Sequence, residues 1–154
     1  MSATFKSLGS LLDNAIDVHH RSGPLYEGLQ QKTSDPRHKQ LLAQMADNEA
    51  RMATLLQDMV GRTNDDILDT RLQYTRELNP QEFIASISPE TNELSLEQIG
   101  RLGEQLHGYL IDLLQGARQA IPAQEGNELL QDLIQLEEAE GRSFSRKTNA
   151  AYEM

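Results

Sequence analysis

The sequence of 154 residues contains no cysteine and no tryptophan, and it has only three phenylalanines and four tyrosines. The absence of cysteine excludes disulfides and thiolate metal sites. The small number of aromatic residues disfavours a stacking surface for nucleic-acid bases or sugars. A metal site in this chain would therefore have to use imidazole and carboxylate ligands.

The chain also lacks any run of about 20 apolar residues, the length needed to span a bilayer. Residues 1–12 do not show a basic segment followed by a long apolar stretch, which is the pattern of a secretory signal. Basic residues are a minority, since 14 Lys and Arg stand against 24 Asp and Glu and give a formal net charge of −10. Because a negative field repels phosphate backbones, nucleic-acid binding is disfavoured. We expect a cytoplasmic protein that binds neither nucleic acid nor membranes.

Four stretches of the chain carry apolar residues at alternating spacings of three and four, the pattern of amphipathic helices. Asp35 and Pro36 form a typical helix start. Ser95 and Gln98 match a capping box, in which each side chain satisfies the other residue's free amide. Pro24 predicts a kink within the first stretch. We predict long helices over residues 4–32, 36–60, 95–121 and 124–147.

Residues 62–92 separate the second and third predicted helices. This segment is too long for a tight turn, and it suits a crossover that carries the chain along a bundle with short helices of its own, one of them over residues 67–77. The sequence therefore predicts a single all-α domain over residues 1–154, a four-helix bundle of two antiparallel hairpins with a long crossover. We expect residues 149–154 to fray and the protein to form a homodimer through a bundle face.

Two histidines and two glutamates lie at nearly matching positions in the two halves of the chain: His19 and Glu49 in the first, His107 and Glu138 in the second. An ionised carboxylate in an apolar stripe is costly unless it is paired or bound to a metal. We therefore expect these four side chains to converge in the middle of the bundle. Carboxylate and imidazole together suit iron, manganese or zinc, so His19, Glu49, His107 and Glu138 are candidate metal ligands. No catalytic residue can be assigned.

The segments 25–29, 35–36 and 47–53 resemble the rubrerythrin-like members of the ferritin-like superfamily. The resemblance extends over residues 12–59 and 100–144. It implies a ferritin-like four-helix bundle in which the first and third helices each supply a Glu and the second and fourth each supply Glu-x-x-His. Members of that family bind two irons with these side chains and carry out oxygen or peroxide chemistry.

The ligand positions that the resemblance implies are only partly matched in this sequence. His19 stands in place of the first Glu, and the position on the third helix falls at or next to His107. The second helix has Glu49 and Met52 in place of Glu and His, and the fourth has Glu138-Ala-Glu-Gly141. At most four of the six ligands remain.

Three states of the site follow from these departures. In the first, the metal site is lost and the His and Glu residues form a buried network, which the two missing histidines favour. In the second, two His and two Glu hold a single ion. In the third, a dinuclear site uses Glu137, Glu140 or water. The first state predicts a structural or interaction protein without a cofactor. The other two predict an iron- or manganese-dependent oxidoreductase or peroxidase.

Overall fold

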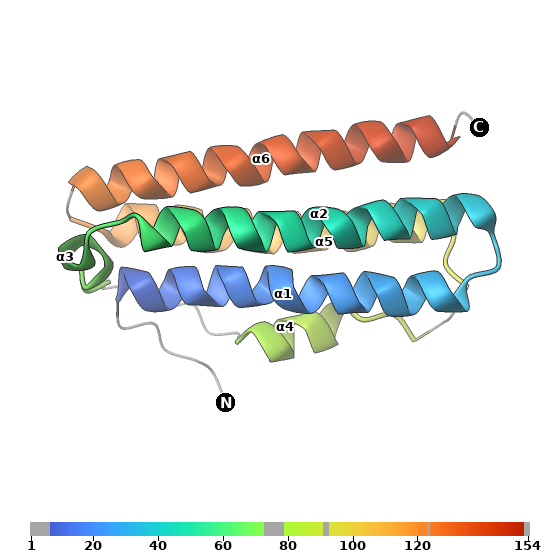
Figure 1. Cartoon of the computed structure of the whole chain (residues 1–154), viewed down its shortest axis with the longest axis horizontal. Coiled ribbons are helices and arrows are strands. Elements are labelled where there is room, and N and C mark those ends of the chain that lie inside the picture. The colour runs from blue at the N-terminus through green and yellow to red at the C-terminus, as the bar shows by residue number, and fades with distance from the viewer. Residues whose placement is uncertain (1–6, 73–78, 91–92, 123, 153–154) are drawn as a thin grey trace.

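The computed structural model describes residues 7–72, 79–90, 93–122 and 124–152. All secondary structure elements among these residues are helices. Two short helices lie in the crossover, α3 (Asp65–Leu68) and α4 (Pro80–Ile87). Four long helices form the bundle (Figure 1), namely α1 (Leu8–Lys32), α2 (Pro36–Gly61), α5 (Leu96–Ala120) and α6 (Gln124–Tyr152). The predicted all-α bundle with a long crossover is confirmed.

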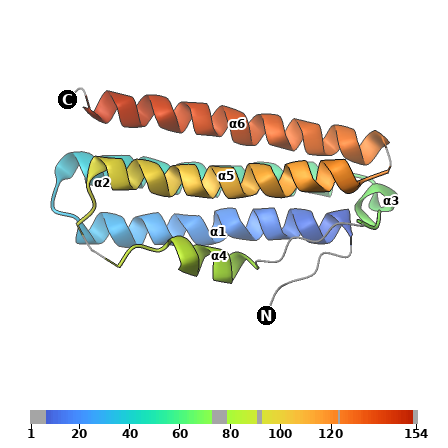
Figure 2. The ribbon, with the colours of Figure 1, turned by 180° about the vertical axis from the view of Figure 1, so that it is seen from behind.

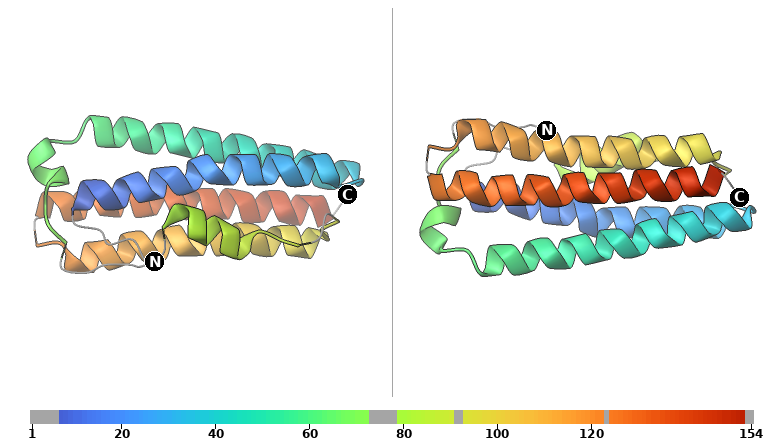
Figure 3. Two further views of the ribbon diagram at one scale, coloured as in Figure 1. Left: turned by 90° about the horizontal axis from the view of Figure 1, so that it is seen from below. Right: turned by 90° about the horizontal axis from the view of Figure 1, so that it is seen from above.

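The four long helices pack as two hairpins, α1 with α2 and α5 with α6, and further contacts join α2 to α6 and α1 to α5. The crossover returns the chain to the end where α2 begins (Figure 2). At that end the backbone N–H of Ser34 donates to Glu93 Oε1 at 3.0 Å. As a result α5 runs in the same direction as α2, and α6 in the same direction as α1 (Figure 3). Every two neighbouring long helices are therefore antiparallel.

Two of the predicted helix starts are present in full. Asp35 accepts a hydrogen bond from the backbone N–H of Arg37 at 2.8 Å, and Pro36 occupies the first turn of α2. Ser95 Oγ accepts from the N–H of Gln98 at 3.1 Å, while Gln98 Oε1 accepts from the N–H of Ser95 at 2.8 Å. These side chains satisfy amides that the helix itself leaves unpaired.

Other boundaries differ from the predictions. α1 is one helix that contains Pro24, in agreement with the predicted range 4–32, and its predicted first turn from Thr4 lies outside the described residues. Where a crossover helix was predicted over residues 67–77, the described helix is the four-residue α3, and residues 73–77 lie outside the described part. α6 extends to Tyr152, so the predicted end at 147 is wrong. Ala151 is buried, and packing of this last part of α6 explains why it does not fray before Tyr152.

The core between the long helices consists mainly of aliphatic side chains, among them Leu12, Leu42, Leu56, Leu110 and Leu133. α4 extends the core on one side of the bundle, because Phe83 is buried and its ring stacks on Tyr109 with 3.9 Å between centroids. Among the described helices, none is both long enough and apolar enough to cross a membrane.

Candidate functional site

His19 is a titratable residue in the middle of the apolar core, and its side chain is completely buried. It lies on the inward face of α1, in the same stripe as Leu12, Ala15 and Tyr26. His19 Nδ1 lies 2.5 Å from Glu49 Oε2 on α2, and His19 Nε2 lies 2.6 Å from Glu137 Oε1 on α6. The imidazole therefore joins three of the four long helices.

The charge of His19 follows from these two contacts. Burial disfavours the charged form and lowers the pKa of His19, but the nearby charge of Glu137 and hydrogen bonds to Glu137 and Glu49 outweigh it. The net effect raises the pKa of His19 from 6.5 to about 10. At neutral pH the ring is an imidazolium that donates one hydrogen bond to each carboxylate.

The two carboxylates and a nearby phenol complete the surroundings of this ring. Glu137 Oε2 is buried and has no hydrogen-bond partner among the described residues. Tyr26 is also buried, and burial together with the negative charge of Glu49 raises the pKa of Tyr26 well above its usual value of 10. The phenol therefore stays neutral beside the ion pairs.

Glu140 is a further buried carboxylate, one turn after Glu137 on α6. Its Oε2 accepts a hydrogen bond from Arg51 Nη2 of α2 at 3.1 Å. The side chain of Arg51 is 58% exposed, which places this second ion pair at the edge of the bundle. It connects α2 and α6 on the solvent side of the His19 network.

Of the four residues predicted to converge, the structure brings only His19 and Glu49 together. The predicted inward position of Glu138 is wrong, because Glu138 is exposed and Glu137 takes the interior place. The physical reason is the rotation of about 100° between successive helical residues, which turns the next side chain away from the core. The same shift applies one helical turn later. The residue three positions after Glu137 is Glu140, whereas the prediction, counted from Glu138, gave Gly141.

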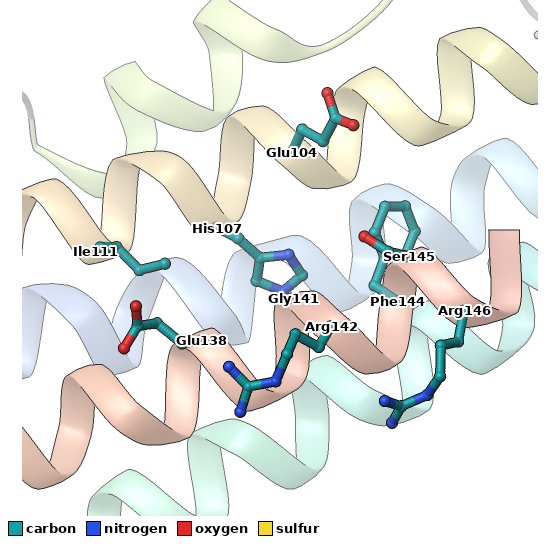
Figure 4. Close-up of a pocket in the computed structure, with 9 residues that line it drawn as sticks. All are labelled: Glu104, His107, Ile111, Glu138, Gly141, Arg142, Phe144, Ser145 and Arg146. Carbon is teal, nitrogen blue, oxygen red and sulfur yellow. The ribbon is translucent and has the colours of Figure 1, made fainter. Parts of the chain in front are cut away.

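His107 is buried as predicted for a core-flanking residue, but it does not join the His19 network. No hydrogen bond or ion pair of His107 is present in the described structure, and its Nε2 is buried without a partner. The ring instead lies against Phe144, with 5.9 Å between ring centroids. His107 and Glu138 both line a pocket on the outer side of α5 and α6 (Figure 4). The predicted convergence of all four residues is therefore wrong for this pair.

A signal in the sequence could have identified Glu137. Leu130, Leu133, Glu137 and Phe144 recur at helical spacing, and the stripe passes through residue 137 rather than 138. The spacing between the two halves also points to Glu137, because Glu137 follows His107 by the same 30 residues that separate Glu49 from His19, whereas Glu138 is one residue further along. The apolar stripe of α6 and the exact repeat therefore agree on the position that the structure shows.

The arrangement does not fit a dinuclear metal centre. A metal ion binds nitrogen and oxygen ligands at about 2.0–2.2 Å, so a nitrogen and an oxygen bound to the same ion lie further apart than about 2.6 Å. The observed distances between the His19 nitrogens and the carboxylate oxygens are 2.5 and 2.6 Å, which are hydrogen-bond distances. Glu49 and Glu137 also lie at opposite nitrogens of His19, so the three side chains do not face a common point. Within the described residues, no group of three or more His, Asp or Glu side chains is arranged to hold a metal ion.

Comparison with known proteins identifies the architecture. No protein-family model and no curated protein matches this sequence. One similar solved structure is the crystal structure of a "putative ferritin-like diiron-carboxylate protein" from Thermotoga maritima. The match has a TM-score of 0.65 and 17% sequence identity, and it covers 97% of this chain and 98% of the other. The chain therefore has a ferritin-like fold.

Proposed function

We propose that this protein is a degenerate member of the ferritin-like superfamily, related to its rubrerythrin-like branch, that has replaced its metal centre with an ion-paired histidine. The observation that carries the proposal is the position of His19 between Glu49 and Glu137. In this arrangement the imidazolium supplies the positive charge that buried carboxylates require. The site then serves to hold the bundle together rather than to carry out redox chemistry.

The proposed role is that of a structural or interaction protein in the cytoplasm, acting as a homodimer and without a cofactor. Three ion-paired contacts, His19 with Glu49, His19 with Glu137 and Arg51 with Glu140, join α1, α2 and α6. The two buried pairs of His19 fix the register of these helices relative to one another. A bundle with a fixed register presents a constant outer surface to a partner.

Metal content tests this proposal. Untagged protein is incubated anaerobically with Fe²⁺ or Mn²⁺, desalted, and measured by elemental mass spectrometry. We expect far less than one ion per chain, because a protonated His19 occupies the space between the carboxylates. Retention of one or two ions per chain would overturn the proposal.

The variant His19→Glu provides a positive control. It removes the buried cation and leaves carboxylates from three helices facing one another, a set of ligands that suits manganese or iron. We expect the variant to unfold at a lower temperature than the wild type and to be stabilised by added Mn²⁺. The wild-type melting temperature should not respond to the same addition.

A second candidate is an iron- or manganese-dependent oxidoreductase of the rubrerythrin type. The description of the Thermotoga maritima structure as a diiron-carboxylate protein and the unpartnered Glu137 Oε2 favour it. The same metal measurement separates the candidates, since this alternative requires stoichiometric metal in the wild type.

A further inference from the structure

The outer side of α5 and α6 contains a pocket that is separate from the His19 network. Its volume is about 590 Å³, within the range of about 300–1,000 Å³ typical of small-molecule sites. Ile111 and Phe144 provide apolar surface in it. The space beside Gly141 is open, because a Cβ atom at this position would meet no other atom within 4 Å. The pocket can therefore admit a small organic molecule.

Four charged side chains line this pocket, two of each sign. Glu104 comes from α5, and Glu138, Arg142 and Arg146 come from α6 (Figure 4). Glu138 and Arg142 are four residues apart, a spacing at which opposite charges often pair on a helix. Within the described part of the chain, none of the four forms an ion pair or hydrogen bond. Both signs therefore remain available to a ligand.

The wall of the pocket also holds an unsatisfied polar atom. His107 is more than nine-tenths buried, and its Nε2 has no hydrogen-bond partner among the described residues. The ring lies between α5 and α6 beside Gly141 (Figure 4), and His107 is one of the residues that line the pocket. Because buried polar groups are normally satisfied, the unpartnered imidazole nitrogen of a residue that lines the pocket is available to hydrogen-bond a bound molecule once the ring adjusts to it.

We propose that this pocket binds a small zwitterion with a hydrocarbon body, such as a free amino acid. The ligand's carboxylate pairs with the arginines of α6, Arg142 and Arg146, and its ammonium group pairs with Glu138 of the same helix. The hydrocarbon part packs on Phe144. A ligand of one charge only would face like charges on one side of the pocket, whereas a zwitterion satisfies both sides. The site does not involve His19, so the proposal is independent of the metal measurements above.

Three probes with the same phenyl ring test the charge requirement by isothermal titration calorimetry at one ionic strength. They are phenylalanine, 3-phenylpropionate and 2-phenylethylamine. We expect phenylalanine to bind about fivefold or more tightly than either of the others, which corresponds to one ion pair of about 1 kcal/mol. Equal or weaker binding of phenylalanine, or no binding of any probe at millimolar concentration, would overturn the proposal.

Glycine variants test the location. Gly141→Leu fills the pocket and should abolish phenylalanine binding. Gly28→Leu on α1 is the matched control, because a Cβ at Gly28 also meets no atom within 4 Å and the residue does not line the pocket. Circular dichroism checks that both variants fold. Wild-type affinity in a folded Gly141→Leu variant would contradict the assignment.

Arginine variants test the role of each charge. Arg142→Gln combined with Arg146→Gln should remove the preference for phenylalanine over 2-phenylethylamine. Arg62→Gln, which alters an exposed arginine directly after the end of α2 and outside the pocket, should preserve that preference. In addition, the NMR signals of the His107 ring should shift when phenylalanine binds to the wild type. An unchanged preference in the double variant or unshifted His107 signals would count against the proposed site.

Discussion

At the scale of single residues, the fully buried His19 determines the character of the bundle interior. An isolated imidazolium would not remain charged in such a place, because burial favours its neutral form. Glu49 and Glu137 reverse this preference and raise the pKa of His19 to about 10. The three side chains must therefore be considered as one unit, in which removing the central cation leaves two buried negative charges without compensation.

Stability should depend on pH through this unit. We predict that His19→Leu lowers the free energy of unfolding by about 3–5 kcal/mol near pH 6.5, since one partner of a buried ion pair is lost. A raised pKa stabilises the folded state fully below the unfolded value of 6.5, and this contribution is lost as the pH rises through about 10. The difference between wild type and variant should therefore decrease from pH 6.5 to pH 10. Urea unfolding of both proteins at several pH values measures this difference in the free energy of unfolding.

Glu49→Gln is the matched variant for this experiment. It keeps the size of the side chain and an acceptor oxygen, and it leaves the contact between His19 and Glu137 in place. Its cost should be smaller, about 1.5–3 kcal/mol, as for one hydrogen bond to a charged group. A pH-independent difference between wild type and His19→Leu would show that His19 is neutral in the folded protein.

At the scale of secondary structure elements, α5 and α6 approach each other at a glycine. A Cβ atom built on Gly103 would lie 2.4 Å from ring atoms of Phe144, which is buried against α5. Gly108, on the same helix, has no atom within 4 Å of the corresponding position. The glycine at position 103 thus permits the close packing of the aromatic ring, whereas the glycine at 108 has no such role.

These two glycines allow a paired prediction. Gly103→Ala should destabilise the protein by about 1–3 kcal/mol, because the buried ring of Phe144 must move. Gly108→Ala should stabilise it by about 0.5–1 kcal/mol, the usual gain from replacing glycine within a helix. Chemical denaturation measures both changes. Equal effects of the two substitutions would show that Phe144 accommodates the added methyl group without cost.

The sequence predicted the helices well where local chemistry defines them. Asp35, Pro36, Ser95 and Gln98 act on their own backbone neighbourhood, so their roles are visible without a tertiary structure. The end of α6 depends on contacts with other helices and is not visible in the local sequence. The choice of Glu138 over Glu137 was an error of one residue in helix register, and such an error moves a side chain from the core to the solvent.

At the scale of the whole molecule, the lengths of the helices and of the crossover were enough to predict the bundle. The homodimer and the single-domain organisation stay predictions.

The surface of the bundle bears on the predicted homodimer. Leu55 is the exposed large hydrophobic residue in the described part of the chain. An interface without an extended apolar patch is expected to be polar and to dissociate readily. A proposed dimer of this protein should therefore depend on concentration.

Light scattering coupled to size-exclusion chromatography measures this property. The mass should approach twice that of the 17.3 kDa chain at high concentration and fall toward 17.3 kDa on dilution. The expected dissociation follows from the small apolar contribution to the interface. A mass of 17.3 kDa at every concentration would contradict the dimer.

The antiparallel order of all neighbouring helices has an electrostatic consequence. Each helix carries about half a positive charge at its N-terminus and half a negative charge at its C-terminus, and these charges act mainly within the terminal turns. Since α1 and α6 run one way and α2 and α5 the other, each end of the bundle combines two positive and two negative helix ends. The helix dipoles largely cancel, so the middle of the bundle experiences little field from the backbone. The charges of Glu49 and Glu137 must therefore be balanced there by side chains.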